Sequence, residues 1–218
     1  MSEEETRHAM QVLRHRVGNV LQLIDGRGGW FEGRIVAAEK RSCLLQVSCL
    51  RREERRAGYK LTLAVAPTKQ MERLEWLVEK STEIGLDTFI PLLTKRGERS
   101  QVRVDRLEKE ALAATKQSLQ AWMPTISRPL SLADCLAACE AEQRFIGWCE
   151  EENPPLLAHN CKAGKDVMIL IGPEGDFTAE EVALAKSYGF VPISLGPNRL
   201  RTETAALAAC HSVQMLNL

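Results

Sequence analysis

Two loops rich in glycine and proline constrain the fold of this chain more than any other feature. The segment IGPEGDF at Ile171–Phe177 follows the apolar run Val167–Leu170, and LGPNRLRTETA at Leu195–Ala205 follows the apolar run Val191–Leu195. Apolar runs of this length are typical of buried parallel strands, and a helical pattern follows each loop. Glycine lets the main chain approach a ligand closely, and proline fixes the turn. The spacing therefore predicts a ligand pocket made from backbone at one edge of a parallel sheet.

The apolar pattern divides the chain near Gly58. Before this residue, alternating segments predict three short strands at Val20–Ile24, Phe31–Ala37 and Cys43–Ser48, around a turn at Asp25–Gly29. We therefore expect a small β-barrel domain at residues 1–58.

From Leu61 onward, strand-length and helix-length segments alternate, which is typical of a parallel sheet covered on both faces. The predicted order is strand Leu61–Ala66, helix Lys69–Ile84, strand Thr88–Leu92, helix Val104–Trp122, helix Leu132–Glu142 and strand Phe145–Cys149. We expect residues 59–218 to form this α/β domain.

Capping signals predict where two helices begin. Thr178 and Glu181 form the T-x-x-E pattern of a capping box, in which each side chain satisfies a free N–H group. After the second loop, the hydroxyl of Thr202 is expected to serve as the N-cap of the last helix. Both helices should therefore begin directly after the glycine loops.

Composition limits the class of protein. The chain has 218 residues with 29 basic and 29 acidic side chains, and its length supports a core without disulfides. The seven cysteines form no C-x-x-C pair and the four histidines are not spaced like metal ligands, so buried thiols are expected rather than a metal site. No apolar run approaches the roughly 20 residues that cross a bilayer, and the first residues are acidic. These features predict a soluble, cytoplasmic protein without a metal or a membrane partner.

Basic residues gather in three clusters, although the net charge is zero. The clusters comprise Arg14, His15 and Arg16; then Arg51, Arg52, Arg55 and Arg56; then Lys95, Arg96, Arg99, Arg103 and Arg106. Such clusters bind a phosphate backbone even in a neutral protein. The alternative is a solvated face with ion pairs inside the chain, which Glu53 and Glu54 favour for the second cluster. The candidate RNA-binding residues are Arg14, Arg16, Arg96 and Arg99.

The paired loops resemble those of the SPOUT methyltransferases, and within that superfamily the RsmE-like enzymes. The family pattern is GPEGGF on the first loop and LGxxxLRTETA on the second, and this chain departs from it at Asp176, where a second glycine is usual. Four further segments look like family elements and occur in the family order: His8–Gly18, Asp25–Gly28, Lys69–Gly85 and Ala114–Pro124. The resemblance therefore spans nearly the whole chain.

Two other departures from the family pattern concern a strand and an arginine. Family members usually open with an extra strand, which we expect to be absent or trimmed because the chain begins only seven residues ahead of His8. The family also carries an acidic residue, an arginine and a serine after the segment that ends near Pro91. Either Lys95–Gly97 or Glu98–Ser100 fills this place, and Arg96 is the preferred counterpart.

The resemblance implies an enzyme dependent on S-adenosylmethionine (SAM) that methylates N3 of a uridine in 16S, small-subunit ribosomal RNA. It also implies a PUA-like RNA-binding domain, a SPOUT domain with a C-terminal trefoil knot, and a homodimer. SAM is expected to lie against the two loops. The implied cofactor-binding residues are Ile171, Gly172, Pro173, Glu174, Gly175, Leu195, Gly196, Leu200, Arg201, Thr204 and Ala205.

Methylation of uridine N3 sets a chemical requirement, because this nitrogen carries a proton and has no free lone pair until the proton leaves. Arg201 is the candidate for stabilising the negative charge that develops on the uracil. Glu203, or alternatively Glu174, is the candidate proton acceptor. Structural roles are the alternatives: a carboxylate in a first helical turn is favoured by the helix dipole, and Arg201 could pair with either glutamate to brace the loop.

Two other functions stay open. A nucleotide-binding α/β enzyme also uses glycine loops at a sheet edge, but the chain contains neither G-x-G-x-x-G nor G-x-x-x-x-G-K-[ST]. A non-catalytic RNA-binding protein of the same fold is favoured by Asp176, whose carboxylate would lie beside the cofactor loop.

Overall fold

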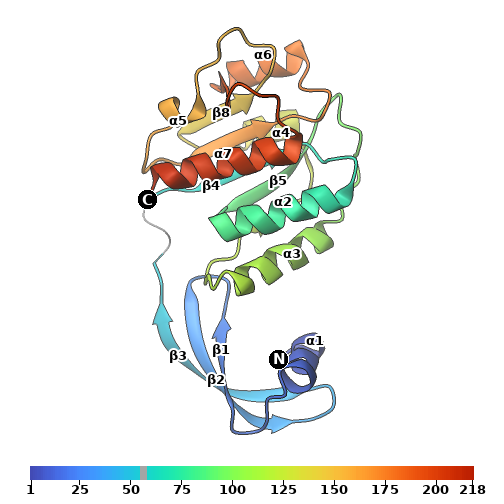
Figure 1. Cartoon of the computed structure of the whole chain (residues 1–218), viewed down its shortest axis with the longest axis vertical. Coiled ribbons are helices and arrows are strands. Elements are labelled where there is room, and N and C mark those ends of the chain that lie inside the picture. Colours follow the sequence, from blue (N-terminus) through green and yellow to red (C-terminus); the bar gives the residue numbers. More distant parts are fainter. Residues whose placement is uncertain (55–57) are drawn as a thin grey trace. The chain divides into compact units, whose positions relative to one another are not determined.

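The computed structural model describes residues 1–54 and 58–218, which divide into two compact units (Figure 1). Within the described residues, the first unit comprises 1–54 together with Gln120–Trp122, and the second comprises 58–119 and 123–218. Two arginines of the second basic cluster, Arg55 and Arg56, lie outside the described residues.

The first unit contains two short helical segments and one antiparallel sheet. Helix α1 (Glu3–Arg7) begins with a capping box from Ser2, and the π-helical turn η1 (His8–Val12) follows it. The sheet has the order β1-β2-β3, with β1 at Val20–Ile24, β2 at Gly29–Ala38 and β3 at Cys43–Arg52. All three predicted strands are confirmed, and β2 and β3 are longer than predicted. In the part of this unit that the structure describes, the predicted small barrel takes the form of an open sheet, because β1 and β3 lie at its two edges.

The turn between β1 and β2 is organised by Asp25. Its Oδ1 accepts the N–H groups of Arg27 at 2.7 Å and Gly29 at 2.8 Å. Gly28 has φ +86°, and a Cβ there would lie 2.5 Å from the carbonyl oxygen of Glu53. Only glycine fits this backbone conformation and this space, which explains the D-G-x-G pattern of the turn.

The second unit is built on a sheet in which every pair of neighbouring strands is parallel, so the predicted α/β class is confirmed. The strand order is β10-β8-β9-β4-β5-β6, and β7 also pairs with β5. The strands are β4 (Leu61–Val65), β5 (Thr88–Leu93), β6 (Thr125–Ile126), β7 (Leu130–Ser131), β8 (Gln143–Gly147), β9 (Val167–Ile171) and β10 (Val191–Ile193).

Helices cover both faces of this sheet, and strand β9 shows why its sequence is apolar throughout. Val167, Ile169 and Ile171 belong to one hydrophobic core, while Met168 and Leu170 belong to the core on the other face. Alternate residues of a strand point to opposite faces, so a strand buried on both sides carries no polar side chain.

The first core lies under three helices, α2 (Met71–Ile84), α3 (Val104–Gln117) and α7 (Thr202–Leu216), and the second lies under α4 (Leu132–Ala137) and α6 (Ala179–Ser187) (Figure 1). The short helix α5 (Leu157–Asn160) follows the acidic surface loop after β8. None of the described helices is long and apolar enough to span a membrane.

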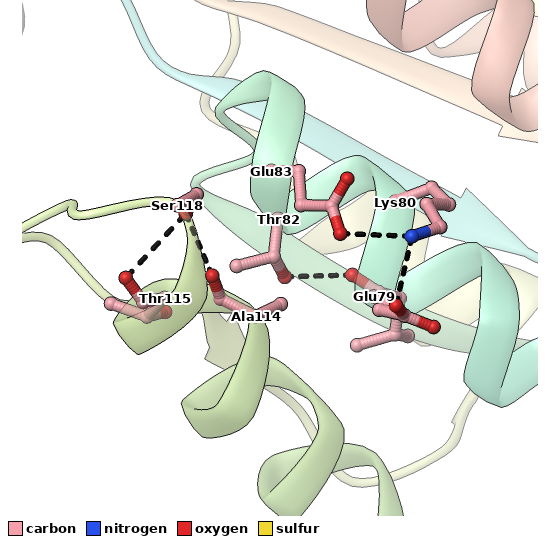
Figure 2. A network of polar contacts seen from close by, with 8 residues as sticks. Glu79, Lys80, Thr82, Glu83, Ala114, Thr115 and Ser118 are labelled. Carbon is pink, nitrogen blue, oxygen red and sulfur yellow. Dashed lines mark hydrogen bonds and ion pairs between the residues drawn. The ribbon is translucent and has the colours of Figure 1, made fainter.

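Local polar contacts hold the neighbouring helices α2 and α3 in shape (Figure 2). On α2, Lys80 donates to Glu79 at 2.8 Å and to Glu83 at 2.9 Å, and these two bonds raise the pKa of Lys80. On α3, Ser118 donates its hydroxyl to the carbonyl of Ala114 at 2.7 Å. This bond lies where α3 ends.

Two predicted helices were too long. Helix α3 ends at Gln117 rather than Trp122, because Leu119 adopts φ +53° and leaves the helical path. Helix α4 ends at Ala137 rather than Glu142. Beyond this end, Arg144 donates to the carbonyls of Cys139 at 3.2 Å and Ala141 at 2.9 Å, so its guanidinium satisfies main-chain groups that follow the helix.

Candidate functional site

A cavity of about 700 Å³ lies at the edge of the sheet where β8, β9 and β10 end. Because the three strands are parallel neighbours, the segments that follow them leave the same edge, as the two glycine loops predicted. The lining residues are Gly147, Trp148, Cys149, Glu151 and Pro154 after β8; Ile171, Gly172, Pro173, Glu174 and Asp176 from the first loop; and Ile193 to Thr202 with Ala205 from the second.

Most of the predicted cofactor-binding residues line this cavity. They are Ile171, Gly172, Pro173, Glu174, Leu195, Gly196, Leu200, Arg201 and Ala205. Gly175 lines a separate small hollow beside Arg96 and Glu98. Thr204 is exposed and is not among the residues that line the main cavity.

The first loop is held by close packing and by the carboxylate of Asp176. A Cβ on Gly172 would lie 3.0 Å from the ring of Phe177, so a larger residue would displace that buried ring. Asp176 is 8% exposed and has φ +61°, a conformation that short polar residues tolerate better than most others. Its Oδ1 accepts the N–H of Phe177 at 2.8 Å, and its Oδ2 accepts the N–H of Cys149 at 3.0 Å. Asp176 therefore links the first loop to the end of β8.

The helix after the first loop begins as predicted, with the capping box of Thr178 and Glu181. Glu181 is buried, and its Oε1 also accepts the N–H of Lys95 at 2.7 Å. Arg96 donates to the carbonyl of Gly175 at 2.8 Å. The segment after β5 is thus bonded to the first loop at Gly175 and to helix α6 at Glu181.

The second loop is bonded to the first through Thr202. The prediction that Thr202 is the N-cap of α7 was wrong: Arg201 holds the extended N-cap conformation, and its side chain makes no capping bond. Thr202 is already the first helical residue, and its buried hydroxyl donates instead to the carbonyl of Gly172 at 3.0 Å. The hydroxyl therefore ties together the two walls of the cavity.

The two glutamates proposed as proton acceptors share one arginine that the sequence did not reveal. Nη1 of Arg73 on α2 lies 3.5 Å from Oε1 of Glu174 and 3.6 Å from Oε1 of Glu203. Glu203 is buried and does not line the cavity, whereas Glu174 does. One sign of this arginine was visible in the sequence. Arg73 lies four positions before Leu77 and therefore beside the apolar stripe of α2.

Arg201 lines the cavity and its side chain is exposed. The ion pairs of Glu174 and Glu203 in the described residues involve Arg73, so Arg73 fills the bracing role that was the alternative for Arg201.

Among the lining residues that were missed, Trp148 and Cys149 lie in no motif, and Arg199 lies at a variable position of the second-loop motif. Partial desolvation at the cavity wall raises the pKa of the Cys149 thiol, and the Asp176 carboxylate raises it further against the opposing charge of Arg199. Chain position alone would have indicated Trp148 and Cys149, since they follow a strand that ends at the same sheet edge.

The candidate RNA-binding residues lie in both units. Arg14 and Arg16 are exposed in the first unit. In the second unit Arg96 donates to the first loop, as described, and Arg99 donates to the carbonyl of Lys69 at 2.7 Å.

The alternative of ion pairs inside the chain holds for part of the second basic cluster. Arg51 pairs with Glu53 at 2.9 Å, and Arg52 pairs with Asp25 at 3.2 Å. Among the residues that the structure describes, no group of histidine, cysteine and carboxylate side chains is arranged to hold a metal ion.

Two protein-family models match segments of this chain. A model described as an RNA methyltransferase domain matches residues 55–214, and one described as an RNA methyltransferase PUA domain matches residues 2–48. The ribosomal RNA small subunit methyltransferase E of Rickettsia conorii is 33% identical over 220 residues, which cover 99% of this chain and 88% of the relative.

Two solved structures are similar over almost all of the chain. A "probable rRNA-methyltransferase" from Porphyromonas gingivalis has a TM-score of 0.93 at 39% identity and covers 99% of this chain and 92% of its own. The ribosomal RNA small subunit methyltransferase E from Neisseria gonorrhoeae, solved with bound SAM, has a TM-score of 0.84 at 25% identity and covers 100% of this chain and 91% of its own.

The chain belongs to the RNA methyltransferase family that includes the ribosomal RNA small subunit methyltransferase E proteins. The predicted resemblance is confirmed, and so is the predicted architecture of a PUA domain with a SPOUT-like parallel-sheet domain. The trefoil knot stays a prediction.

Proposed function

We propose that this chain is a SAM-dependent methyltransferase that acts on N3 of a uridine in small-subunit 16S ribosomal RNA. The observation that carries the proposal is the cavity of about 700 Å³ between the two loops of its RNA methyltransferase domain. The Neisseria relative binds SAM and is named for methylation of small-subunit RNA, which supports the same assignment here.

The residues of the cavity fit a nucleoside cofactor. Its volume lies within the range of roughly 300–1,000 Å³ that is usual for small-molecule sites. Apolar side chains of Ile171, Leu195, Leu200 and Ala205 offer a surface for an adenine ring, and glycine-bearing loops offer peptide groups to its edge. These residues, with Gly172, Pro173, Glu174, Gly196 and the main chain of Arg201, would hold SAM.

Bound SAM supplies the methyl group in an electrophilic form. The chain's own contribution is to position the uracil and to handle its charge and its proton. The exposed guanidinium of Arg201 stabilises the negative charge on a uracil carbonyl oxygen. The pair of carboxylates around Arg73 provides the proton acceptor: Glu203, or Glu174, which lines the cavity.

RNA contact is assigned to both parts of the chain. We assign residues 1–58 to a PUA-like RNA-binding domain and residues 59–218 to the knotted methyltransferase domain. Arg14 and Arg16 in the first, and Arg96 and Arg99 in the second, contact phosphates of the ribosomal RNA or the assembled small subunit. A cytoplasmic homodimer, paired through the knotted domain, is the proposed working form.

The test is methyl transfer from labelled SAM to small ribosomal subunits, or their RNA, that lack this modification. One methyl group on uracil N3, identified after nuclease digestion by mass spectrometry, is the expected result. Transfer to a ribose or to guanine would contradict the N3 assignment.

A variant separates catalysis from binding. Arg201→Ala should retain SAM binding and lose turnover, whereas the exposed Arg128→Ala, far along the chain from the loops, should retain both. Equal losses of binding and turnover in Arg201→Ala would mean that Arg201 shapes the cavity instead. SAM binding by the wild type without any transfer would favour the non-catalytic alternative.

A further inference from the structure

Asp176 brings a carboxylate to the wall of the cavity, in addition to bonding the first loop to the end of β8. The backbone conformation there, φ +61°, is one that glycine adopts freely. The side chain is nevertheless buried, with 8% of the residue exposed, and it lines the cavity. A buried carboxylate costs solvation free energy, so its presence in this wall calls for a partner.

The other two acidic residues of the lining have cationic partners within the chain. Glu174 lies 3.5 Å from Arg73, and Glu151 lies 2.8 Å from Lys186. In the described residues, Asp176 accepts the main-chain N–H groups of Cys149 and Phe177 and the thiol of Cys149, and no ion pair joins it to a side-chain cation. Asp176 is therefore the lining carboxylate whose charge a ligand can balance.

The remaining charges of the lining are Arg199 and Arg201. Both side chains are exposed. Solvent screens exposed charges far more than buried ones, so the buried carboxylate has the stronger effect on a charge inside the cavity.

The cofactor and the product of the proposed reaction differ by one charge. SAM carries a sulfonium, and the loss of its methyl group leaves S-adenosylhomocysteine (SAH), whose sulfur is a neutral thioether. All other groups of the two molecules are the same. A fixed negative charge near the sulfur stabilises the sulfonium and not the thioether, whereas its effect on the ammonium and carboxylate groups is common to both molecules.

We infer that Asp176 is a specificity-determining residue, whose carboxylate makes the cavity bind cationic SAM more tightly than neutral SAH. This inference rests on the proposed function, because it requires SAM to occupy the cavity. It gives the carboxylate a use in turnover: the product loses the charge that held the cofactor and leaves more readily.

The competing explanation is that Asp176 only fastens the first loop to Cys149. The two explanations predict different affinities. If Asp176 only fastens the loop, its loss changes the shape of the cavity and weakens the binding of SAM and of SAH by the same factor. If the charge of Asp176 acts on the sulfonium, its loss weakens the binding of SAM alone.

The experiment is isothermal titration of the full chain with SAM and with SAH, for the wild type, Asp176→Asn and Asp176→Gly. The asparagine keeps the size of the side chain and removes its charge, and the glycine fits the positive φ, so at least one variant should fold. We expect the ratio Kd(SAH)/Kd(SAM) to fall about tenfold in both variants, which is about 1.4 kcal/mol, while Kd(SAH) changes by less than about threefold.

Glu151→Gln is the matched control, because Glu151 lines the same cavity but is paired with Lys186. Its ratio should stay within about twofold of the wild type. Equal weakening of SAM and SAH in the Asp176 variants would overturn the inference and leave the proposed function intact. Failure of the folded wild type to bind either molecule would instead overturn the proposed function.

Discussion

The hydroxyl of Thr202, the first residue of α7, donates a hydrogen bond of 3.0 Å to the carbonyl of Gly172 in the first loop. The two residues are thirty positions apart in the chain, and Thr202 is buried. A buried hydrogen bond between the two loops fixes the width of the cavity that they enclose.

Replacement of Thr202 by valine, which has the same shape without the donor, should therefore loosen the cavity. Because the Gly172 carbonyl loses this donor, we expect the free energy of unfolding to fall by about 1–3 kcal/mol. We also expect the affinity for SAM to fall about tenfold, measured by titration calorimetry beside urea unfolding. Thr115→Val is the control: this buried threonine on α3 donates to Ala111 within its own helix, so SAM affinity should not change. Unchanged SAM affinity in Thr202→Val would show that the loops do not depend on this bond.

Much of the fold follows from local sequence signals. The strands β4 and β9 and the start of α6 were predicted correctly, because an apolar run or a capping box lies within a few adjacent residues. The ends of α3 and α4 were not predicted. They depend on Leu119 and on Arg144, which act against the helical pattern of the preceding residues.

The sequence predicted the two loops of the site but not the contacts that join them to each other and to α2. The residues that lie in glycine motifs were found, since their spacing marks them. The bond from Thr202 to Gly172 and the ion pairs of Arg73 join segments distant in sequence, and no local pattern encodes which partner a side chain will meet. Asp176 was recognised only as a departure from a pattern, and its bond to Cys149 required the structure.

Arg73→Met should reduce turnover more than cofactor binding. Arg73 holds Glu174 and Glu203, the two proposed proton acceptors, and its loss leaves the largely buried carboxylate of Glu203 without this cation. We expect the free energy of unfolding to fall by about 1–3 kcal/mol, which lies between the losses typical of exposed and of buried ion pairs. We expect kcat to fall at least about tenfold with little change in the Kd of SAM.

Arg106→Met is the matched control for this positioning residue. Arg106 lies 2.7 Å from Glu75 on α2, and neither residue lines the cavity. Its loss should lower stability slightly and leave kcat unchanged. If Arg73→Met and Arg106→Met have the same kcat as the wild type, Arg73 has only a structural role.

Thiol labelling should report whether SAM occupies the cavity. Cys149 is exposed at the cavity wall, and Cys49 is exposed in the first unit. We expect SAM to slow the reaction of Cys149 with a disulfide reagent at least about fivefold and to leave Cys49 unchanged. Since partial desolvation and Asp176 raise the pKa of Cys149, its rate of reaction should also increase with pH above neutrality. Buried Cys135, whose pKa is raised to about 12 mainly by burial, should react only after unfolding. Mass spectrometry of labelled peptides distinguishes the sites, and equal rates for Cys149 with and without SAM would place the cofactor elsewhere.

The turn between β1 and β2 should weaken in acid because of Asp25. The N–H groups of Gly29 and Arg27, and then the charge of Arg52, lower the pKa of Asp25 below its ordinary value of 3.8. A lowered pKa in the folded state means that the carboxylate stabilises the turn at pH values above the ordinary pKa, and that this stabilisation is lost as the pH falls through the lowered pKa.

Hydrogen exchange at the Gly29 amide should therefore show easier opening of the turn below about pH 4. Asp25→Asn should already show this easier opening at pH 7, with little further change in acid, whereas Asp105→Asn on α3 should leave the Gly29 amide unaffected. A Gly29 amide whose protection is the same in Asp25→Asn and the wild type at pH 7 would mean that the carboxylate does not hold the turn.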